Sequence, residues 1–305
     1  MGLNLDSLLV LDAIDRRGSF AAAAAELNRV PSAITYQVQK LEQDLDVLLF
    51  DRRGHRAKLT PAGRELLREG RELLRAAGEL EQRIKRVATG WEAELGIAVD
   101  TIVPFPALYP LLDRFYRDCA NQGNVRTRLR LSSEVLAGTW EALVDGRADL
   151  AIGAPGDAPP GAHVRARRLG EVQMVFAVAP EHPLAAAGEP IATATLRAHR
   201  IVAIADSSRT SPPRTMGLID GQDSLTVHDM PAKLAAQLAG LGCGWLPRFL
   251  AAPEAAAGRL VIKRTDEPRA PLPMQVAWRT ERPGKALAWW LKALDDGRWA
   301  ALLAR

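Results

Sequence analysis

The segment 19–45, SFAAAAAELNRVPSAITYQVQKLEQDL, constrains the fold most, because its pattern predicts two short helices joined by a tight turn. The alanine-rich run 21–25 favours the first helix, and Asn28 tolerates the left-handed backbone that a sharp turn requires. Pro31 suits the first position of the second helix, where a missing N–H has no partner in any case. This pattern is typical of a DNA-binding helix-turn-helix, and also of an ordinary helical hairpin.

The second helix is predicted to have two different faces. Its apolar positions recur at three and four residues, as a core-facing stripe requires, and are Ile34, Val38, Leu41 and Leu45. Its opposite face carries Ser32, Thr35, Tyr36 and Gln39. A row of small polar side chains on an exposed helix can enter the major groove and contact base edges.

The flanks of this segment favour DNA binding over a plain hairpin. Apolar residues between Leu5 and Ile14 predict a further helix, so that three helices can close a small core, and residues 47–50 suit a short buried strand. Residues 1–60 contain eight Lys or Arg and eight Asp or Glu, but four of the cations fall between Arg52 and Lys58. A solvated charge run is the alternative for such a cluster. Beside a helix-turn-helix it is expected to grip phosphate, with Arg52 and Arg56 foremost.

The chain resembles the LysR-type transcriptional regulators over this region. The family pattern is an alanine-rich helix, a turn, a recognition helix ending in Leu-Glu, then Leu-Phe-x-Arg and Leu-Thr-x-Ala-Gly. It is matched by Ala22, Ala23, Leu27, Ala33, Gln37, Leu41, Glu42, Leu49, Phe50, Arg52, Leu59, Thr60, Ala62 and Gly63. The resemblance implies a winged helix-turn-helix in residues 1–60 that binds double-stranded promoter DNA.

Two departures from the family bear on DNA recognition. Where relatives often carry Ser-Gln-Pro and then Ser-Arg, this chain has Val30, Pro31 and Ser32, and then Thr35 and Tyr36. Bidentate pairing of Gln to adenine and of Arg to guanine is therefore missing here. The hypothesis is that methyl contacts, hydroxyls and DNA shape provide specificity. The predicted DNA-binding residues are Pro31, Ser32, Thr35, Tyr36, Lys40, Arg52, Arg53 and Arg56.

A long helix is predicted from Pro61 to about Ala88, with Thr60 as its cap and no internal proline. Its apolar residues fall at heptad spacing, which predicts pairing of two such helices, and the predicted dimerisation residues are Leu66, Leu73, Leu80, Ile84 and Val87. The alternative is a helix packed on its own domain. The resemblance implies that residues 61–89 are the dimerisation helix of a homodimer, often within a homotetramer.

From Trp91 onward, strand-like runs alternate with helical ones, which predicts an α/β domain with a parallel sheet covered on both faces. The runs are 95–100, 128–133, 149–153, 174–180, 200–206, 225–230, 244–247 and 274–279, with helices including 108–119, 139–145 and 286–294. The resemblance implies a two-lobed effector domain, like the periplasmic binding proteins, over residues 90–305. Its lobes are expected at about 90–163 with 269–305, and at 164–268. The interlobe crossings are expected near 161–167 and 263–271.

Ligands of such sheets bind beyond the carboxyl ends of the strands. The predicted effector-binding residues are Thr101, Leu136, Ser207, Arg209 and Asp229. The position aligned with Leu136 is commonly a small hydroxyl residue in relatives that bind carboxylates, so Leu136 argues for a more apolar effector. The chain is most similar to family members linked to aromatic or quinone-like compounds. This similarity suggests a small organic effector of the same kind.

Other classes of protein are less compatible with the sequence. No apolar run approaches a membrane span, and the start MGLNLD lacks a signal core, so a cytoplasmic location is expected. The five histidines are scattered and a phosphate loop is missing, so neither an enzyme, a cofactor nor a metal site is expected. A solute-binding protein would not need the first 60 residues.

Cys119 and Cys243 leave a redox-sensing role through Cys243 as an alternative. RNA polymerase is an expected partner if the protein activates transcription.

Overall fold

The computed structural model describes residues 3–51, 58–121, 127–161, 163–209, 221–279, 283–295 and 297–304. It divides into two compact units, Met1–Ile84 and Lys85–Arg305, which are described separately. Within these described ranges, no helix is both long and apolar enough to cross a membrane.

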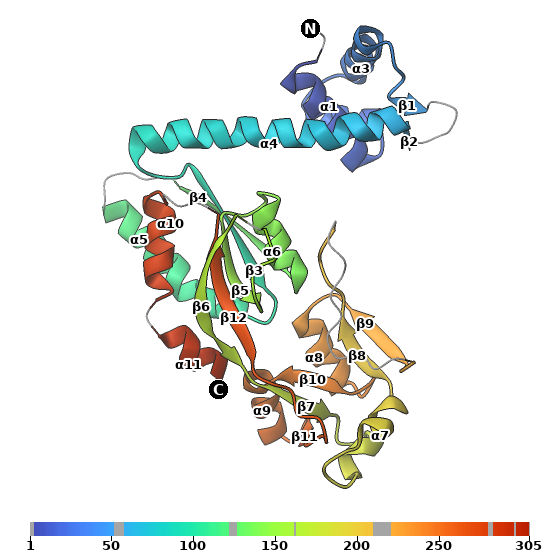
Figure 1. Ribbon diagram of the computed structural model, residues 1–305, viewed down its shortest axis with the longest axis vertical. Helices are drawn as coiled ribbons and strands as arrows, with labels where there is room; N and C mark the ends of the chain where they lie inside the picture. The colour runs from blue at the N-terminus through green and yellow to red at the C-terminus, as the bar shows by residue number, and fades with distance from the viewer. Residues whose placement is uncertain are drawn as a thin grey trace. The chain divides into compact units, whose positions relative to one another are not determined.

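The first unit is a helical domain with a two-stranded wing (Figure 1). Its elements are α1 (Leu5–Arg17), α2 (Phe20–Glu26), α3 (Pro31–Leu45), β1 (Phe50–Asp51), β2 (Lys58–Leu59) and the start of α4 (Pro61–Thr89). Asn28 has a φ of 53° in the turn between α2 and α3, which confirms the left-handed geometry expected there. Buried Ile34, Val38 and Leu41 of α3 pack in a core with residues of α1 and α2.

Two local predictions for this unit are wrong. Leu45 is 39 % exposed, because α3 ends there and Asp46 takes a left-handed cap conformation with a φ of 53°. The predicted strand 47–50 begins only at Phe50, since Val47 and Leu48 are exposed and Leu49 is the residue that turns inward.

The family motif residues around the wing have clear structural roles. The buried Glu42 carboxylate accepts hydrogen bonds from the backbone N–H groups of Leu49 (2.8 Å) and Phe50 (3.2 Å), which ties α3 to the wing. Thr60 caps α4 by accepting from Gly63 N–H at 3.0 Å, and its hydroxyl donates to Leu48 O at 2.7 Å. A Cβ on Gly63 would stand 2.2 Å from Leu49 O, so only glycine fits there.

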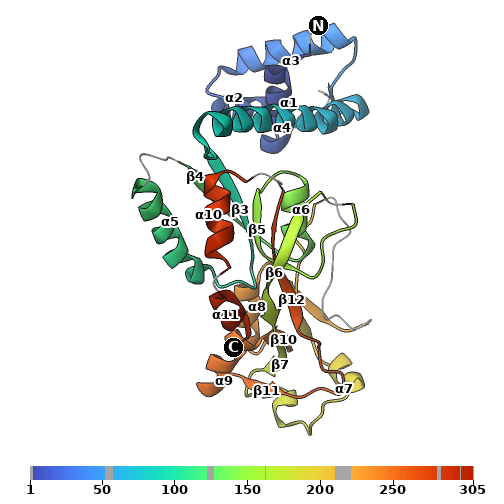
Figure 2. The same ribbon diagram turned by 60° about the vertical axis from the view of Figure 1, so that its left-hand side comes forward.

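The second unit begins with a five-stranded sheet in the order β4-β3-β5-β12-β6. The strands are β3 (Glu94–Asp100), β4 (Arg128–Glu134), β5 (Leu150–Pro155), β6 (Arg165–Val172) and β12 (Leu272–Trp278). Helices α5 (Tyr109–Asn121) and α10 (Lys285–Ala293) cover one face, and α6 (Ala137–Val144) covers the other (Figures 1 and 2). The alternation along β3 matches this, because Ile97 and Val99 pack towards α5 while Ala98 packs with Trp140 of α6.

The second lobe contains two groups of strands, β10-β7-β11 and β8-β9. Its strands are β7 (Met174–Val178), β8 (Ile201–Ile204), β9 (Ser224–Val227), β10 (Gly244–Pro247) and β11 (Val261–Lys263). Its α-helices are α7 (Thr193–Arg197), α8 (Met230–Leu238) and α9 (Arg248–Ala256), and 3-10 turns run over Phe105–Leu108 in the first lobe and Pro183–Ala186 here. A closing helix, α11 (Arg298–Ala304), packs on β6 of the first lobe.

The all-parallel sheet predicted from the strand pattern is wrong. Strand β3 is parallel to β4 and β5, but β12 is antiparallel to both β5 and β6, and β7 is antiparallel to β10 and β11. The five-stranded sheet is mixed because the chain returns to the first lobe in the opposite direction along β12, whereas β10-β7-β11 is wholly antiparallel and β8-β9 is parallel.

The first predicted interlobe crossing is also wrong. Residues 165–167 belong to β6, which pairs with β12 in the first lobe over its length, so the chain crosses at Gln173 between β6 and β7. The second crossing, between β11 and β12, lies at residues 264–271, within the range expected for it.

Candidate functional site

The exposed face of α3 carries the side chains that the sequence predicts for DNA contact. Pro31, Ser32 and Lys40 are exposed, and Tyr36 is 67 % exposed. Thr35 is half-buried, and its hydroxyl donates to Pro31 O at 3.0 Å. The hydroxyl proton of Thr35 is therefore used within the helix, which leaves its methyl group and the lone pairs of its hydroxyl oxygen for a partner.

Charged residues at the start of α1 and in the turn hold Gln37 of α3. The Gln37 amide donates to Asp6 at 2.7 Å and accepts from Arg29 at 2.9 Å. Arg29 pairs with Asp6 at 2.6 Å, and this hydrogen bond lowers the pKa of the Asp6 carboxyl. Gln37 is thus fixed by protein partners, while Tyr36 beside it points to solvent.

Arg52, Arg53 and Arg56, predicted to grip phosphate, lie outside the described residues. They stay predictions.

The linker helix α4 has an exposed apolar row from Leu73 onward. Leu73 is 50 % exposed, Leu80 51 %, Ile84 61 % and Val87 87 %. Leu66 differs, because it packs partly against the core of the helical domain beside buried Leu67. A Cβ on Gly70 would lie 2.6 Å from Leu8, so this glycine allows α4 to approach α1 closely.

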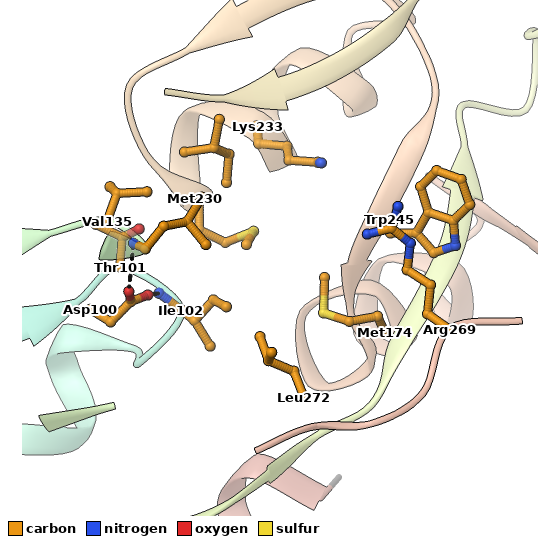
Figure 3. Close-up of a pocket in the computed structure, with 12 residues that line it drawn as sticks. Asp100, Thr101, Ile102, Val135, Met174, Met230, Lys233, Trp245, Arg269 and Leu272 are labelled. Atoms are coloured by element: carbon orange, nitrogen blue, oxygen red, sulfur yellow. Dashed lines mark hydrogen bonds between the residues drawn. The ribbon is translucent and has the colours of Figure 1, made fainter. Parts of the chain in front are cut away.

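A pocket of about 530 Å³, its open mouth included, lies between the two lobes of the second unit (Figure 3). The first lobe contributes Asp100, Thr101, Ile102, Val135 and Leu136. The second lobe contributes Met174, Ile204, Met230, Lys233, Trp245 and Arg269, and Leu272 at the start of β12 completes the lining.

Asp100 forms the acidic side of this pocket at the end of β3. Its buried carboxylate accepts hydrogen bonds from Ile102 N–H (2.9 Å), Leu136 N–H (3.0 Å) and the Thr139 hydroxyl (3.0 Å). Burial raises the pKa of Asp100 to about 7, although these three hydrogen bonds oppose the rise. Asp100 therefore orders the loop between β4 and α6, where Leu136 has a φ of 53°.

Two cations form the opposite side of the pocket, on the second lobe (Figure 3). Lys233 is 6 % exposed on α8, and burial lowers its pKa to about 8, with Arg269 adding to the shift. The Arg269 guanidinium lies 4.0 Å from the centre of the Trp245 ring, and burial lowers its pKa. Among the described residues, no carboxylate lies within 4.0 Å of either cation.

Helix α8 is anchored so that Lys233 faces inward. Asp229 caps the helix by accepting from Ala232 N–H at 2.7 Å. Gln237, fully buried one turn after Lys233, donates to Ala177 O of β7 (2.8 Å) and to Gly244 O of β10 (3.0 Å). These bonds fix the face of α8 that carries Lys233 against the strands.

The five predicted effector residues do not all lie at this pocket. Thr101 and Leu136 line it, and Asp229 lines a neighbouring cavity with Thr101 and Pro231. Ser207 instead joins the lobes, because its hydroxyl accepts from Val135 N–H at 2.9 Å and donates to Glu134 at 2.7 Å. Arg209 is exposed, and its backbone N–H donates to Glu141 at 2.8 Å.

The segment containing Ser207 contacts the first turn of α6 closely. Asp206 accepts from the N–H groups of Ala137 (3.2 Å) and Gly138 (3.1 Å). A Cβ on Gly138 would lie 1.9 Å from the Ser207 hydroxyl, so the contact requires glycine. The amino end of α6 is therefore capped by a carboxylate from the other lobe.

Sequence reasoning missed the charged residues of the pocket. Lys233 lies in the apolar run MPAKLAAQL, and a lone lysine there is the only sequence sign of a buried cation. Asp100 is the last residue of an apolar strand and directly precedes Thr101, which the sequence predicts as an effector-binding residue. The same rule about strand ends could therefore have found Asp100. Arg269 lies within an expected interlobe crossing and gave no separate sign.

Neither cysteine has the properties of a reactive thiol. Cys243 is fully buried, its Sγ donates to Arg200 O at 3.3 Å, and burial raises its pKa to about 11. Cys119 is also buried, with a raised pKa caused by desolvation. Because oxidation proceeds through the thiolate, burial argues against redox sensing through Cys243.

A helix-turn-helix followed by a two-lobed domain with a pocket between the lobes defines the class of ligand-responsive DNA-binding regulators. Residues 5–64 match the model of the bacterial regulatory helix-turn-helix protein, lysR family, and residues 88–298 match that of the LysR substrate binding domain. The chain belongs to the LysR family of transcriptional regulators. This membership also sets aside the reading of the chain as a solute-binding protein.

Similar proteins extend over almost the whole chain. The uncharacterized HTH-type transcriptional regulator YeeY of Escherichia coli (strain K12) is 42 % identical, over 94 % of this chain and 91 % of YeeY. The probable HTH-type transcriptional regulator YhaJ of the same strain is 42 % identical, over 96 % of each chain. The crystal structure of full-length CbnR complexed with its target DNA has a TM-score of 0.60 at 23 % identity, covering 96 % of this chain and 99 % of CbnR. This likeness supports the fold.

Proposed function

We propose that this regulator binds operator DNA as a homodimer or homotetramer in the cytoplasm and that a small organic effector in the interlobe pocket controls it. The observation that carries the DNA-binding part is α3, which buries one face and leaves Pro31, Ser32, Tyr36 and Lys40 exposed on the other. The solved complex of CbnR with its target DNA supports double-stranded DNA as the partner.

DNA contact is proposed to combine apolar and polar groups. Pro31 and the Thr35 methyl meet thymine methyls, because the Thr35 hydroxyl already donates to Pro31 O. The hydroxyls of Ser32 and Tyr36 and the Lys40 ammonium contact base edges or phosphates. Arg52, Arg53 and Arg56 add phosphate contacts, so their loss should weaken binding to all sequences and flatten its salt dependence.

Dimerisation is proposed to cover the exposed row of α4. Leu73, Leu80, Ile84 and Val87 leave an unusually large apolar surface for a helix that is otherwise rich in Arg and Glu. Pairing two such helices would bury this row and place two recognition helices on two half-sites.

The effector is proposed to have an apolar body, aromatic or quinone-like. Apolar residues make up most of the pocket wall, among them Leu136, Ile102, Met174, Met230 and Leu272. The dimer or tetramer has two arrangements, of which one is competent to bind DNA. The effector acts by binding these two arrangements with different affinities. If the protein activates transcription, RNA polymerase is its further partner.

A gel-shift titration of the full-length protein on DNA upstream of its own gene tests the DNA-binding proposal. Tyr36→Ala should weaken specific binding about tenfold, as expected for one base contact. Tyr116→Ala, which removes another exposed tyrosine from the second unit, is the matched control and should bind as the wild type does. Equal binding by both variants would remove Tyr36 from the DNA interface.

A further inference from the structure

The second-lobe wall of the pocket carries positive charge without a matching negative charge. Lys233 is 6 % exposed, and its ammonium points into the cavity (Figure 3). Arg269 lies over Trp245 at 4.0 Å, which stabilises the guanidinium but does not neutralise it. The ion pairs among the described residues leave both cations without a carboxylate. Buried charges in proteins are normally paired, so this arrangement is incomplete without a ligand.

Among the first-lobe residues that line the pocket, Thr101 has the one hydroxyl that could donate to an anion, and the backbone N–H groups at the start of α6 are not free. The three backbone N–H groups at the start of α6 are already used, by Asp100 for Leu136 and by Asp206 for Ala137 and Gly138. Both acceptors are acidic side chains, Asp100 with a pKa of about 7, so a ligand anion at this wall would find no free backbone donor and would be repelled whenever they are ionised. A negative group is therefore directed to the second lobe.

The apolar residues of the pocket determine what kind of ligand body fits. Between the acidic and basic sides lie Ile102, Leu136, Met174 and Leu272, which offer apolar contact and no hydrogen-bond donors from their side chains. Methionine side chains adapt to the shape of a ring or a branched chain. A second anionic group on the far side would approach Asp100, which disfavours a dianion.

We propose that the effector is a small apolar monoanion whose negative group binds between Lys233 and Arg269 while its body lies against Leu136, Ile102 and Met174. This inference rests on the proposed role of the interlobe pocket and names the chemical class that the pocket takes. An aromatic carboxylate satisfies every part of the lining.

The test compares matched acids and amides on the full-length protein by thermal shift and calorimetric titration. The probes are benzoate with benzamide, salicylate with salicylamide, and gentisate with gentisamide and hydroquinone, at one ionic strength set with NaCl. At least one acid should raise the melting temperature, and its neutral partner should not. Lys233→Met keeps the length and burial of the side chain, and should weaken binding of that acid about 30-fold or more.

Control variants separate the pocket from general charge effects. Lys292→Met removes an exposed lysine of α10 and should leave acid binding unchanged. Arg269→Met should weaken acid binding as Lys233→Met does. The proposal is overturned if no acid stabilises the wild type beyond the NaCl control, if the amides or hydroquinone stabilise it equally, or if Lys233→Met binds the acids normally.

Failure of the proposed function has a different signature. The same protein samples are titrated onto operator DNA with and without the acid that binds. Acid binding that depends on Lys233, with an unchanged DNA complex, would uphold the ligand class and contradict effector control of DNA binding. Loss of operator binding in every sample would contradict the DNA-binding proposal and leave the calorimetric result standing.

Discussion

The helix-turn-helix unit and the interlobe pocket handle charge in opposite ways. In the first unit, charged side chains at the surface form ion pairs, as Asp6 does with Arg29 and Arg71 does with Asp12 and Asp15. In the pocket, Lys233 and Arg269 are buried or half-buried without an acidic partner among the described residues. These surface charges of the first unit are therefore balanced within the chain. The pocket has positive charge that an anionic ligand can neutralise.

The largest expected effect concerns the exposed row of α4. Leu80→Asp places a charge where two helices are proposed to pair, so the dimer should dissociate. Operator affinity should fall about 100-fold or more, because the two half-sites are no longer bound by one linked pair. Sedimentation together with gel shift measures both changes. A dimeric Leu80→Asp variant with normal operator affinity would contradict the role of this row, and Glu81→Asp serves as the neighbouring control.

The next effect distinguishes the stability of the two units. Gly63→Ala forces a Cβ towards Leu49 O at 2.2 Å, and should lower the free energy of unfolding of the helical domain by about 3 kcal/mol. The unfolding transition of the effector domain should stay in place when both are followed by calorimetry. Gly78→Ala, in the same helix with nothing within 4 Å, should raise stability by about 0.5–1 kcal/mol. Equal effects of the two changes would contradict the close approach at Gly63.

A comparable effect of opposite sign is expected in the pocket. Lys233→Met removes a buried cation and should stabilise the ligand-free effector domain at pH 7 by about 2–3 kcal/mol. The pKa of Lys233 is lowered from 10.5 to about 8, so the folded state releases its proton before the unfolded state does. The wild type should therefore gain stability as the pH rises from 8 towards 10.5, and the difference from Lys233→Met should shrink. Denaturant unfolding across this pH range measures the difference, and a destabilised Lys233→Met variant would show that the lysine has a structural partner.

The smallest effect concerns which part of Thr35 contacts DNA. Thr35→Val keeps a methyl group and removes the hydroxyl that donates to Pro31 O, so operator affinity should change little. Thr35→Ser keeps the hydroxyl and removes the methyl, and should cost about 1 kcal/mol of discrimination at a thymine. Competition gel shifts with single-base operator variants measure this. The reverse order would mean that the hydroxyl is the contacting group.

The same comparison explains what the sequence could predict. The helix-turn-helix depends on local patterns, because the α3 stripe, the Asn28 turn and the Thr60 cap are each encoded within a few residues. The long helix α4 was anticipated for the same reason, since it runs from Pro61 to Thr89 without a proline. Such features follow from spacing and capping alone.

The pocket depends on contacts between distant segments. The start of strand β6 falls within the predicted crossing 161–167, because the arginines of RARRLGEV hide its pairing with β12, about 100 residues later. Nothing in the local sequence distinguishes Lys233 from a lysine that faces solvent. Its burial follows from the hydrogen bonds of Gln237, which fix α8 against β7 and β10. Ser207 lies three residues after the end of β8, and its hydroxyl is used between the lobes, which no local pattern reveals.

Footprinting of the operator with the stabilising acid tests the link between the two regions most directly. The acid that raises the melting temperature is titrated onto wild-type and Lys233→Met protein bound to the DNA upstream of the gene. The expected result is a shift in the protected region for the wild type, with no shift for Lys233→Met at the same concentrations. An unchanged wild-type footprint, or an equal shift in both proteins, would contradict control of DNA binding through the charged pocket.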